Sequence, residues 1–164
     1  MSQDQILEEV GSHGIKLVEL TGGEPLAQPR TPGLAQALLD QGYSVLIETS
    51  GSEPIRTLPP KVHVIMDIKC PDSGMAAKNL WENIDDLKPS DEIKFVIASR
   101  GDYEWAKGVA AKHCLYQKTR VLMSPAFGLL KPDKLSAWIV EDRLNVRLNL
   151  QQHKYIWNPK AKGV

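Results

Sequence analysis

A glycine pair after the first apolar run of the sequence is the clearest candidate binding element. The stretch Thr21-Gly22-Gly23-Glu24-Pro25 comes directly after the apolar run at residues 16–20. Adjacent glycines let the backbone approach a ligand because no Cβ atom intervenes, and their amides and carbonyls could hold an amino acid or a phosphate group. The spacing is not GxGxxG and no GK[ST] follows, so neither of the two common nucleotide-binding loops is indicated.

Charged residues stand at two further places where ligand chemistry is possible. Asp67 and Lys69 alternate around Ile68 at the end of a predicted strand, so both side chains point to one face. They either form a structural ion pair or contact a ligand. The stretch His153-Lys154-Tyr155 offers an acid, a cation and a stacking ring, or else it is a solvated C-terminal edge.

The other predicted strand ends also carry hydroxyls, charges or glycines. They read Glu48-Thr49-Ser50-Gly51, Ala98-Ser99-Arg100-Gly101 and Ser124-Pro125-Ala126-Phe127-Gly128. In parallel α/β proteins, binding sites form beyond the carboxyl ends of the strands, and all of these segments would face the same side. We therefore predict a functional face at this end of the sheet.

The elements that must position these residues follow from the apolar spacing. It predicts strands at residues 16–20, 43–48, 62–68, 92–98, 119–123 and 145–150, and helices at 2–13, 31–42, 79–87, 103–113 and 131–143. Strands that alternate with helices favour an α/β fold with a mainly parallel sheet. No linker or repeat divides the sequence, so residues 1–164 are predicted to form a single domain. The first predicted element is a helix, whereas such folds usually begin with a strand.

Composition excludes several classes of function. The chain has 164 residues with 20 basic and 20 acidic side chains, so nucleic acid is not an expected partner. No apolar run is long enough for a membrane span, and the acidic N-terminus is unlike a secretory signal, so we expect a cytoplasmic location and no membrane partner. Cys70 and Cys114 are too far apart to form a metal-ligand motif, and we expect both to be reduced.

Four motifs together resemble one enzyme family. They are TGGEP at 21–25, IETSGS at 47–52, MDIKCPDSGM at 66–75 and VRLNLQQHKYIW at 146–157. The first resembles the glycine-glycine-glutamate motif of the radical S-adenosylmethionine superfamily, and the whole set is similar to the 7-carboxy-7-deazaguanine synthases. The resemblance implies a queuosine-pathway lyase that converts 6-carboxy-5,6,7,8-tetrahydropterin to 7-carboxy-7-deazaguanine with loss of ammonia. It also implies a (β/α) barrel, here of about six mainly parallel strands.

The resemblance also implies site residues. Those matching S-adenosylmethionine contacts are Gly22, Gly23, Glu24, Glu48, Ser50, Asp67, Ile68, Lys69, Ser124, Pro125, Ala126 and Phe127. Those matching contacts to the small-molecule pterin substrate are Thr21, His153, Lys154 and Val164. The resemblance assigns no catalytic side chain, and it implies a homodimer.

The sequence departs from the family in one respect. The family's CxxxCxxC motif, which ligates a [4Fe–4S] cluster, and the hydroxyl ligand for Mg²⁺ beside it do not occur here, so the metal ligands are absent from this chain. We expect that the family's first strand and cluster loop are missing and that this chain alone is inactive. Two alternatives remain: a binding module without a cluster on the same scaffold, and an unrelated α/β protein in which TGGEP is a plain turn.

Overall fold

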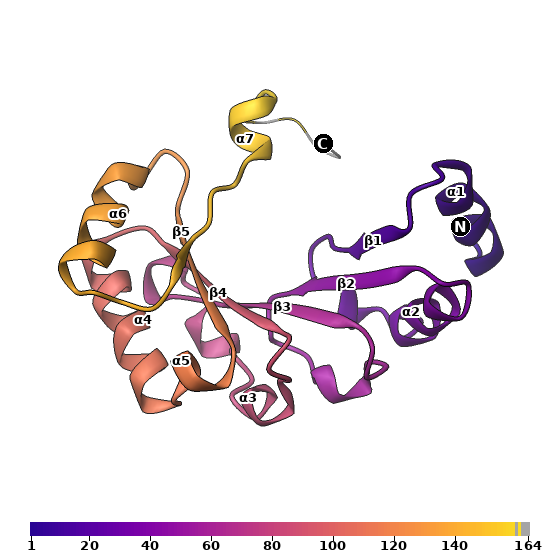
Figure 1. Ribbon diagram of the computed structural model, residues 1–164, viewed down its shortest axis with the longest axis horizontal. Coiled ribbons are helices and arrows are strands. Elements are labelled where there is room, and N and C mark those ends of the chain that lie inside the picture. The colour runs from indigo at the N-terminus through magenta and orange to yellow at the C-terminus, as the bar shows by residue number, and fades with distance from the viewer. Residues whose placement is uncertain (160, 162–164) are drawn as a thin grey trace.

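Six parallel strands form one curved sheet through the protein. The computed structural model describes residues 1–159 and 161. The strands are β1 (Leu17–Leu20), β2 (Ser44–Thr49), β3 (His63–Ile68), β4 (Glu92–Ile97), β5 (Arg120–Pro125) and β6 (Arg147–Leu148). They lie in sequence order, and each pairs with the next in parallel (Figure 1). The predicted α/β fold with a parallel sheet is therefore confirmed.

Helices connect the strands. They are α1 (Gln3–Ser12), α2 (Thr31–Asp40), α3 (Asn83–Asp86), α4 (Arg100–Lys112), α5 (Leu115–Lys118), α6 (Pro132–Glu141) and α7 (His153–Ile156). Four 3₁₀ turns add η1 (Pro25–Ala27), η2 (Ile55–Thr57), η3 (Pro71–Ser73) and η4 (Ala76–Lys78). Figure 1 shows α2 to α6 along the outer side of the sheet and α7 on the opposite side. Among the described residues β1 and β6 do not pair with each other, so the sheet is an open barrel segment.

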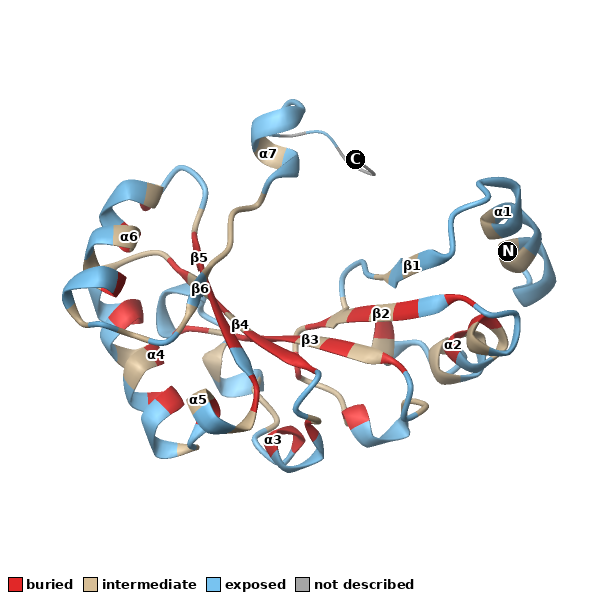
Figure 2. Cartoon of the chain, viewed as in Figure 1, coloured by how far each residue is buried: buried red, intermediate tan, exposed pale blue. Residues whose placement is uncertain are grey.

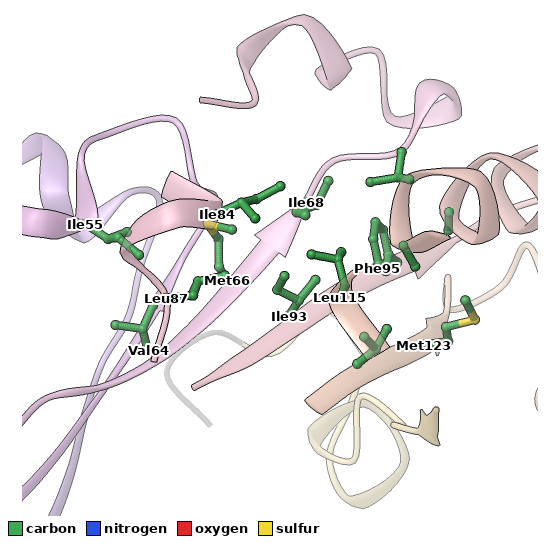
Figure 3. Close-up of a cluster of buried hydrophobic side chains, with 14 of the residues drawn as sticks. Ile55, Val64, Met66, Ile68, Ile84, Leu87, Ile93, Phe95, Leu115 and Met123 are labelled. Atoms are coloured by element: carbon green, nitrogen blue, oxygen red, sulfur yellow. The ribbon is translucent and has the colours of Figure 1, made fainter. Parts of the chain in front are cut away.

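The outer face of the sheet is apolar because alternate strand residues point toward the helices. It carries Val45, Ile47, Val64, Met66, Ile93, Phe95, Val121 and Met123, each at most 2% exposed. Figure 2 shows the buried residues concentrated along the central strands. Figure 3 shows side chains of β3, β4 and β5 in one cluster with Ile84, Leu87 and Leu115. Full burial of such a side chain stabilises a fold by about 1.5–3 kcal/mol, so this face is the core.

The inner face of the same strands carries charge. Asp67 on β3 lies opposite Lys94 on β4, and Glu92 on β4 lies opposite Arg120 on β5. Glu92 Oε1 is 3.0 Å from Arg120 Nη1 and 3.3 Å from Arg147 Nη2 on β6. Charged residues therefore occupy inner-face positions on β3, β4 and β5, and they are available to line a site.

Local sequence signals explain the first helix. The Ser2 hydroxyl accepts a hydrogen bond from the Gln5 amide at 3.2 Å, and the Gln5 side chain accepts one from the Ser2 amide at 2.8 Å. This reciprocal capping box satisfies two backbone donors at the helix start. The predicted beginning of α1 is confirmed.

The predicted helix at residues 79–87 is wrong over most of its length, because α3 begins only at Asn83. The Asn79 side chain bonds both backbone groups of Lys69, with its Oδ1 accepting at 2.9 Å and its Nδ2 donating at 3.0 Å. The Leu80 amide donates to the Gly51 carbonyl at 3.0 Å. These bonds hold residues 79 and 80 against the strand ends, so tertiary contacts override a helical apolar spacing.

The end of the chain also differs from the prediction. The strand predicted at 145–150 is paired only at Arg147–Leu148, and α5 and α7 have no counterpart among the predicted helices. After β6 the chain leaves the sheet, with the Asn149 amide still donating to the Met123 carbonyl at 2.9 Å. Among the described residues, no helix is long and apolar enough to cross a membrane.

Candidate functional site

A cavity of about 470 Å³ opens where the carboxyl ends of β1, β2 and β3 meet the segment after β6. This volume lies in the range of small-molecule sites. The cavity is lined by Thr21, Gly22, Gly23, Glu48, Thr49, Ser50, Asp67, Lys69, Lys94, Asn149, Leu150, Gln151, Gln152 and His153. Its position agrees with the functional face that the sequence predicts.

The glycine pair presents bare backbone to this cavity. A Cβ atom built on Gly22 or on Gly23 meets no atom within 4 Å, so the space beside both residues is open. Gly22 has φ +131°, a conformation that side chains disfavour, whereas Gly23 has an ordinary backbone. The pair therefore forms a wall against which a ligand can lie close to the main chain.

Glu24 holds this loop in place. Its carboxylate accepts hydrogen bonds from the Leu26 amide at 2.9 Å, the Ser50 amide at 2.7 Å and the Thr49 hydroxyl at 2.8 Å. The Ser50 hydroxyl donates to the same carboxylate. Glu24 does not line the cavity, so its contacts connect the loop after β1 to the loop after β2 and orient Gly22 and Gly23.

Four charged side chains form the polar base of the cavity. Lys69 Nζ lies 2.8 Å from Asp67 Oδ2, so the predicted ion-pair geometry is present, and both residues also line the cavity. Lys94 forms an ion pair with Glu48 and lies 4.0 Å from Asp67 Oδ2. The other oxygen of Asp67, Oδ1, is buried without a hydrogen-bond partner within the described part of the chain. A buried unpaired acceptor is costly, and because Oδ1 has almost no exposed surface, a ligand donor would reach it only after the Asp67 side chain turns.

Burial shifts the pKa values of two of these four side chains. It raises the pKa of Asp67, and the neighbouring Lys69 charge and hydrogen bond partly offset that rise. Burial also lowers the pKa of Lys94, against the opposing charge of Glu19. Ionised groups held in a partly desolvated cleft are a common feature of functional sites.

The C-terminal segment supplies the opposite wall. Asn149 lines the cavity and donates from Nδ2 to the buried Ser124 hydroxyl at 3.2 Å. His153 also lines the cavity, whereas Lys154 lies over the Phe127 ring, with Nζ 5.6 Å from the ring centre. The Tyr155 ring packs edge-on against Phe127 at 5.5 Å, which connects α7 to the loop after β5.

The structure brings together eight of the sixteen predicted site residues in one cavity. Those that line the cavity are Thr21, Gly22, Gly23, Glu48, Ser50, Asp67, Lys69 and His153. Those that do not are Glu24, Ile68, Ser124, Pro125, Ala126, Phe127 and Lys154. Ile68 points to the apolar outer face and is 3% exposed. Val164 lies outside the described residues.

Sequence reasoning missed Lys94, Asn149 and Leu150 as cavity residues and gave Gln151 and Gln152 no individual role, whereas Thr49 belongs to the predicted strand end Glu48-Thr49-Ser50-Gly51. The sequence does contain a signal for Lys94, because Glu92 and Lys94 alternate with Ile93 and Phe95 in a strand that is otherwise apolar. A period of two with charge on one side indicates a polar inner face. For Asn149 and Leu150 the signal is weaker, because the apolar spacing predicts a regular strand over residues 145–150.

The described residues do not provide an iron–sulfur site. No group of three or more His, Cys, Asp or Glu side chains among them could hold a metal ion. Cys70 is buried and Cys114 is exposed, and both are free thiols. Three thiolates are needed for the three cluster irons that a CxxxCxxC loop ligates, so the chain does not fit the cluster.

The chain was compared with known proteins. No family model matches it. All of it aligns with the 7-carboxy-7-deazaguanine synthase of Koribacter versatilis, at 46% identity over 79% of that protein. It also aligns fully with the enzyme of the same name from Chlorobaculum tepidum, at 44% identity over 76%. A crystal structure of QueE from Escherichia coli matches with TM-score 0.71 and 25% identity, covering 92% of this chain and 64% of that one.

Proposed function

The chain belongs to the 7-carboxy-7-deazaguanine synthase family, and from this premise we propose that its cavity binds S-adenosylmethionine beside a pterin substrate. The observation that carries the proposal is the bare backbone of Gly22 and Gly23 at the cavity wall. The family chemistry is the conversion of 6-carboxy-5,6,7,8-tetrahydropterin to 7-carboxy-7-deazaguanine in queuosine biosynthesis. S-adenosylmethionine, when bound, supplies the 5′-deoxyadenosyl group on which this chemistry depends.

The cavity offers complementary groups for a ligand that carries both signs of charge. Gly22 and Gly23 would hold the methionine end of S-adenosylmethionine, because main-chain groups there meet no side chain. The exposed part of the Asp67 carboxylate would accept a hydrogen bond from the cofactor, and Lys69 would supply a cation beside it. A turn of the Asp67 side chain toward the ligand would also give Oδ1 the partner that it lacks within the described part of the chain.

The substrate would lie between the two walls of the cavity. Thr21 stands at one wall and His153 at the other, and both line the open space. A hydroxyl and an imidazole can donate and accept hydrogen bonds, which suits the polar edge of a pterin. Lys154 packs over Phe127 instead, so we assign it to holding α7 near the cavity rather than to direct contact.

The residues of this chain support binding and not radical chemistry. The sequence contains two cysteines, the buried Cys70 and the exposed Cys114, and it does not contain the CxxxCxxC motif that ligates the cluster in the superfamily. We therefore derive no step through the cluster or through Mg²⁺, and we propose that these 164 residues bind S-adenosylmethionine weakly and do not cleave it. The single domain, the homodimer and the cytoplasmic location remain predictions.

Isothermal titration calorimetry with S-adenosylmethionine tests the proposal. The decisive variant is Gly23→Ala, because the added methyl group fits the free chain without strain and occupies the space that the ligand needs. We expect its dissociation constant to rise about tenfold or more, with thermal stability unchanged. Gly33→Ala is the matched control, since a Cβ atom there also meets nothing within 4 Å but lies on α2. Equal affinity of Gly23→Ala and wild type would refute the proposed cofactor contact.

A further inference from the structure

One lysine inside the cavity is tied to carboxylates from two other strands. Lys94 on β4 lines the cavity, and its side chain is 12% exposed. Its ammonium forms an ion pair with Glu48 on β2 and lies 4.0 Å from Asp67 Oδ2 on β3. These three residues span three neighbouring strands, and we call them the Lys94 triad.

The strand register shows that this arrangement is not a simple cross-strand pair. Lys94 lies opposite Asp67 on the adjacent strand, but Glu48 lies opposite Ile65. The lysine side chain therefore crosses over β3 to reach β2. The inner face is concave, and a long flexible side chain can make this connection where a shorter one cannot.

Sheet stability alone does not explain a buried lysine at this position. Taking an ammonium and a carboxylate out of water costs several kcal/mol per ion, and well-packed apolar residues often stabilise such a position as well or better. Leu122, the β5 neighbour of Lys94 on the same face, is apolar and 2% exposed, so the sheet accepts apolar residues here. We therefore infer that the charge of Lys94 has a role other than stabilising the sheet.

We propose that Lys94 is a positioning residue for the ligand of this cavity. It holds the carboxylates of Glu48 and Asp67 toward the cavity, so that they accept hydrogen bonds from the ligand. All three residues line the cavity, and Asp67 Oδ1 has no partner in the described part of the chain. The other charged groups that face the triad are Glu19 on β1 and Lys69 directly after β3.

The triad determines the class of ligand group that fits beside it. With Lys94 and Lys69 charged, two cations balance the two carboxylates that line the cavity, and the nearby Glu19 adds one further acidic side chain, so the site has no excess of positive charge. Such a base favours hydrogen-bond donors such as N–H and O–H groups over a bare anion, which two carboxylates would repel. This inference rests on the proposed function and deepens it.

Binding of S-adenosylmethionine by variants of Lys94 tests the proposal. Lys94→Met is expected to raise the dissociation constant about tenfold, and Lys94→Arg to restore most of the affinity because it keeps the cation. Lys61→Met is the matched control, because Lys61 is exposed and lies outside the cavity, and it should bind like wild type. Lys94→Gln replaces the methionine variant if that one does not fold. Wild-type affinity in the uncharged variants, or no recovery with arginine, would overturn the proposal.

A second measurement needs no ligand. The Asp67 side-chain carboxyl can be titrated by ¹³C NMR in wild type, Lys94→Met and Lys94→Arg. Burial already raises the pKa of Asp67, and removing a cation 4.0 Å away should raise the pKa further. Arginine should return it toward the wild-type value. An Asp67 pKa that does not respond to Lys94 would overturn the coupling within the triad.

The two measurements separate the failure of the ligand assignment from the failure of the triad. If wild type does not bind S-adenosylmethionine but the Asp67 titration responds to Lys94, the proposed cofactor is wrong and the triad is upheld. If wild type binds and Lys94→Met binds equally well, the proposed function stands and Lys94 has only a structural role.

Discussion

Replacement of Glu24 by alanine should loosen the loop that carries the glycine pair. The Glu24 carboxylate accepts from four donors, which are the amides of Leu26 and Ser50 and the hydroxyls of Thr49 and Ser50. The Ser50 hydroxyl has another partner, since its Oγ lies 3.0 Å from Ser52 Oγ. The Thr49 hydroxyl accepts from the Gly51 amide but would lose the acceptor for its own proton. The two backbone amides have no other acceptor in the described part of the chain, so their loss sets the minimum effect.

The magnitude follows from those two amides. A hydrogen bond to a charged acceptor contributes about 1.5–3 kcal/mol, and the partial exposure of Glu24 favours the lower end, so Glu24→Ala should cost about 3 kcal/mol. Glu24→Gln keeps one acceptor oxygen and should cost about half as much. Since the free energy of unfolding of a small domain is about 5–15 kcal/mol, the alanine variant should remain folded but be clearly less stable.

Urea unfolding followed by circular dichroism measures this loss. Glu8→Ala is the matched control, because Glu8 is an exposed glutamate on α1 and should change the free energy of unfolding by less than about 0.5 kcal/mol. Glu24→Ala should also weaken binding of S-adenosylmethionine, because Gly22 and Gly23 lose their support. A Glu24→Ala variant as stable as the control would refute the role given to this carboxylate.

Three further predictions concern the scaffold and its thiols. Gly51→Ala should destabilise the fold by about 1–3 kcal/mol in urea unfolding, because Gly51 has φ +69° and a Cβ atom there would meet Met66 Cγ at 3.0 Å. Gly108→Ala lies in the middle of α4, where a Cβ atom meets nothing within 4 Å, and should instead stabilise the fold by about 0.5–1 kcal/mol. If both alanine variants changed the free energy of unfolding in the same direction, the packing described at Gly51 would be contradicted. Dithionitrobenzoate should modify Cys114 in the native protein and Cys70 only after unfolding, because Cys70 is buried and that burial raises its pKa. Rapid modification of both thiols in the native protein would contradict the burial of Cys70. The Lys107 hydrogen bond lowers the pKa of Asp142 below the ordinary value of 3.8, so its stabilisation is present above that value and is lost as pH falls through the lower folded pKa. Thermal unfolding of Asp142→Asn should therefore depend less on pH than wild type in the acid range, and equal pH dependence would show that this pair contributes nothing.

Much of the scaffold was predictable because it depends on local patterns. Apolar runs in β2, β3 and β4 match buried strands, and the Ser2 capping box fixes the start of α1. The predicted order of elements is confirmed by the parallel sheet. Local patterns do not predict the conformation of residues 79–82, because the Asn79 side chain forms hydrogen bonds with the backbone of Lys69, ten residues earlier and just after β3, in place of a helical turn.

The site was predictable where it depends on the carboxyl ends of the strands. Thr21, Gly22 and Gly23 follow β1 directly, and parallel topology places them beside Asp67 and Lys69. Lys94 lies within its strand rather than after it, so a search of strand ends passes over it. Side-chain length was the missing factor, because only a long side chain on β4 reaches β2.

NMR titration of the uniformly ¹⁵N-labelled chain with S-adenosylmethionine shows where the cofactor binds. We expect saturable shifts of the Gly22 and Gly23 amides, together with those of Ser50 and Lys69, which line the same cavity. The amides of Gly33 and Gly108, which lie on α2 and α4 outside the cavity, should stay in place. Saturable shifts confined to other parts of the chain, or no shift of the glycine pair at millimolar ligand, would contradict the assignment of this cavity to the cofactor.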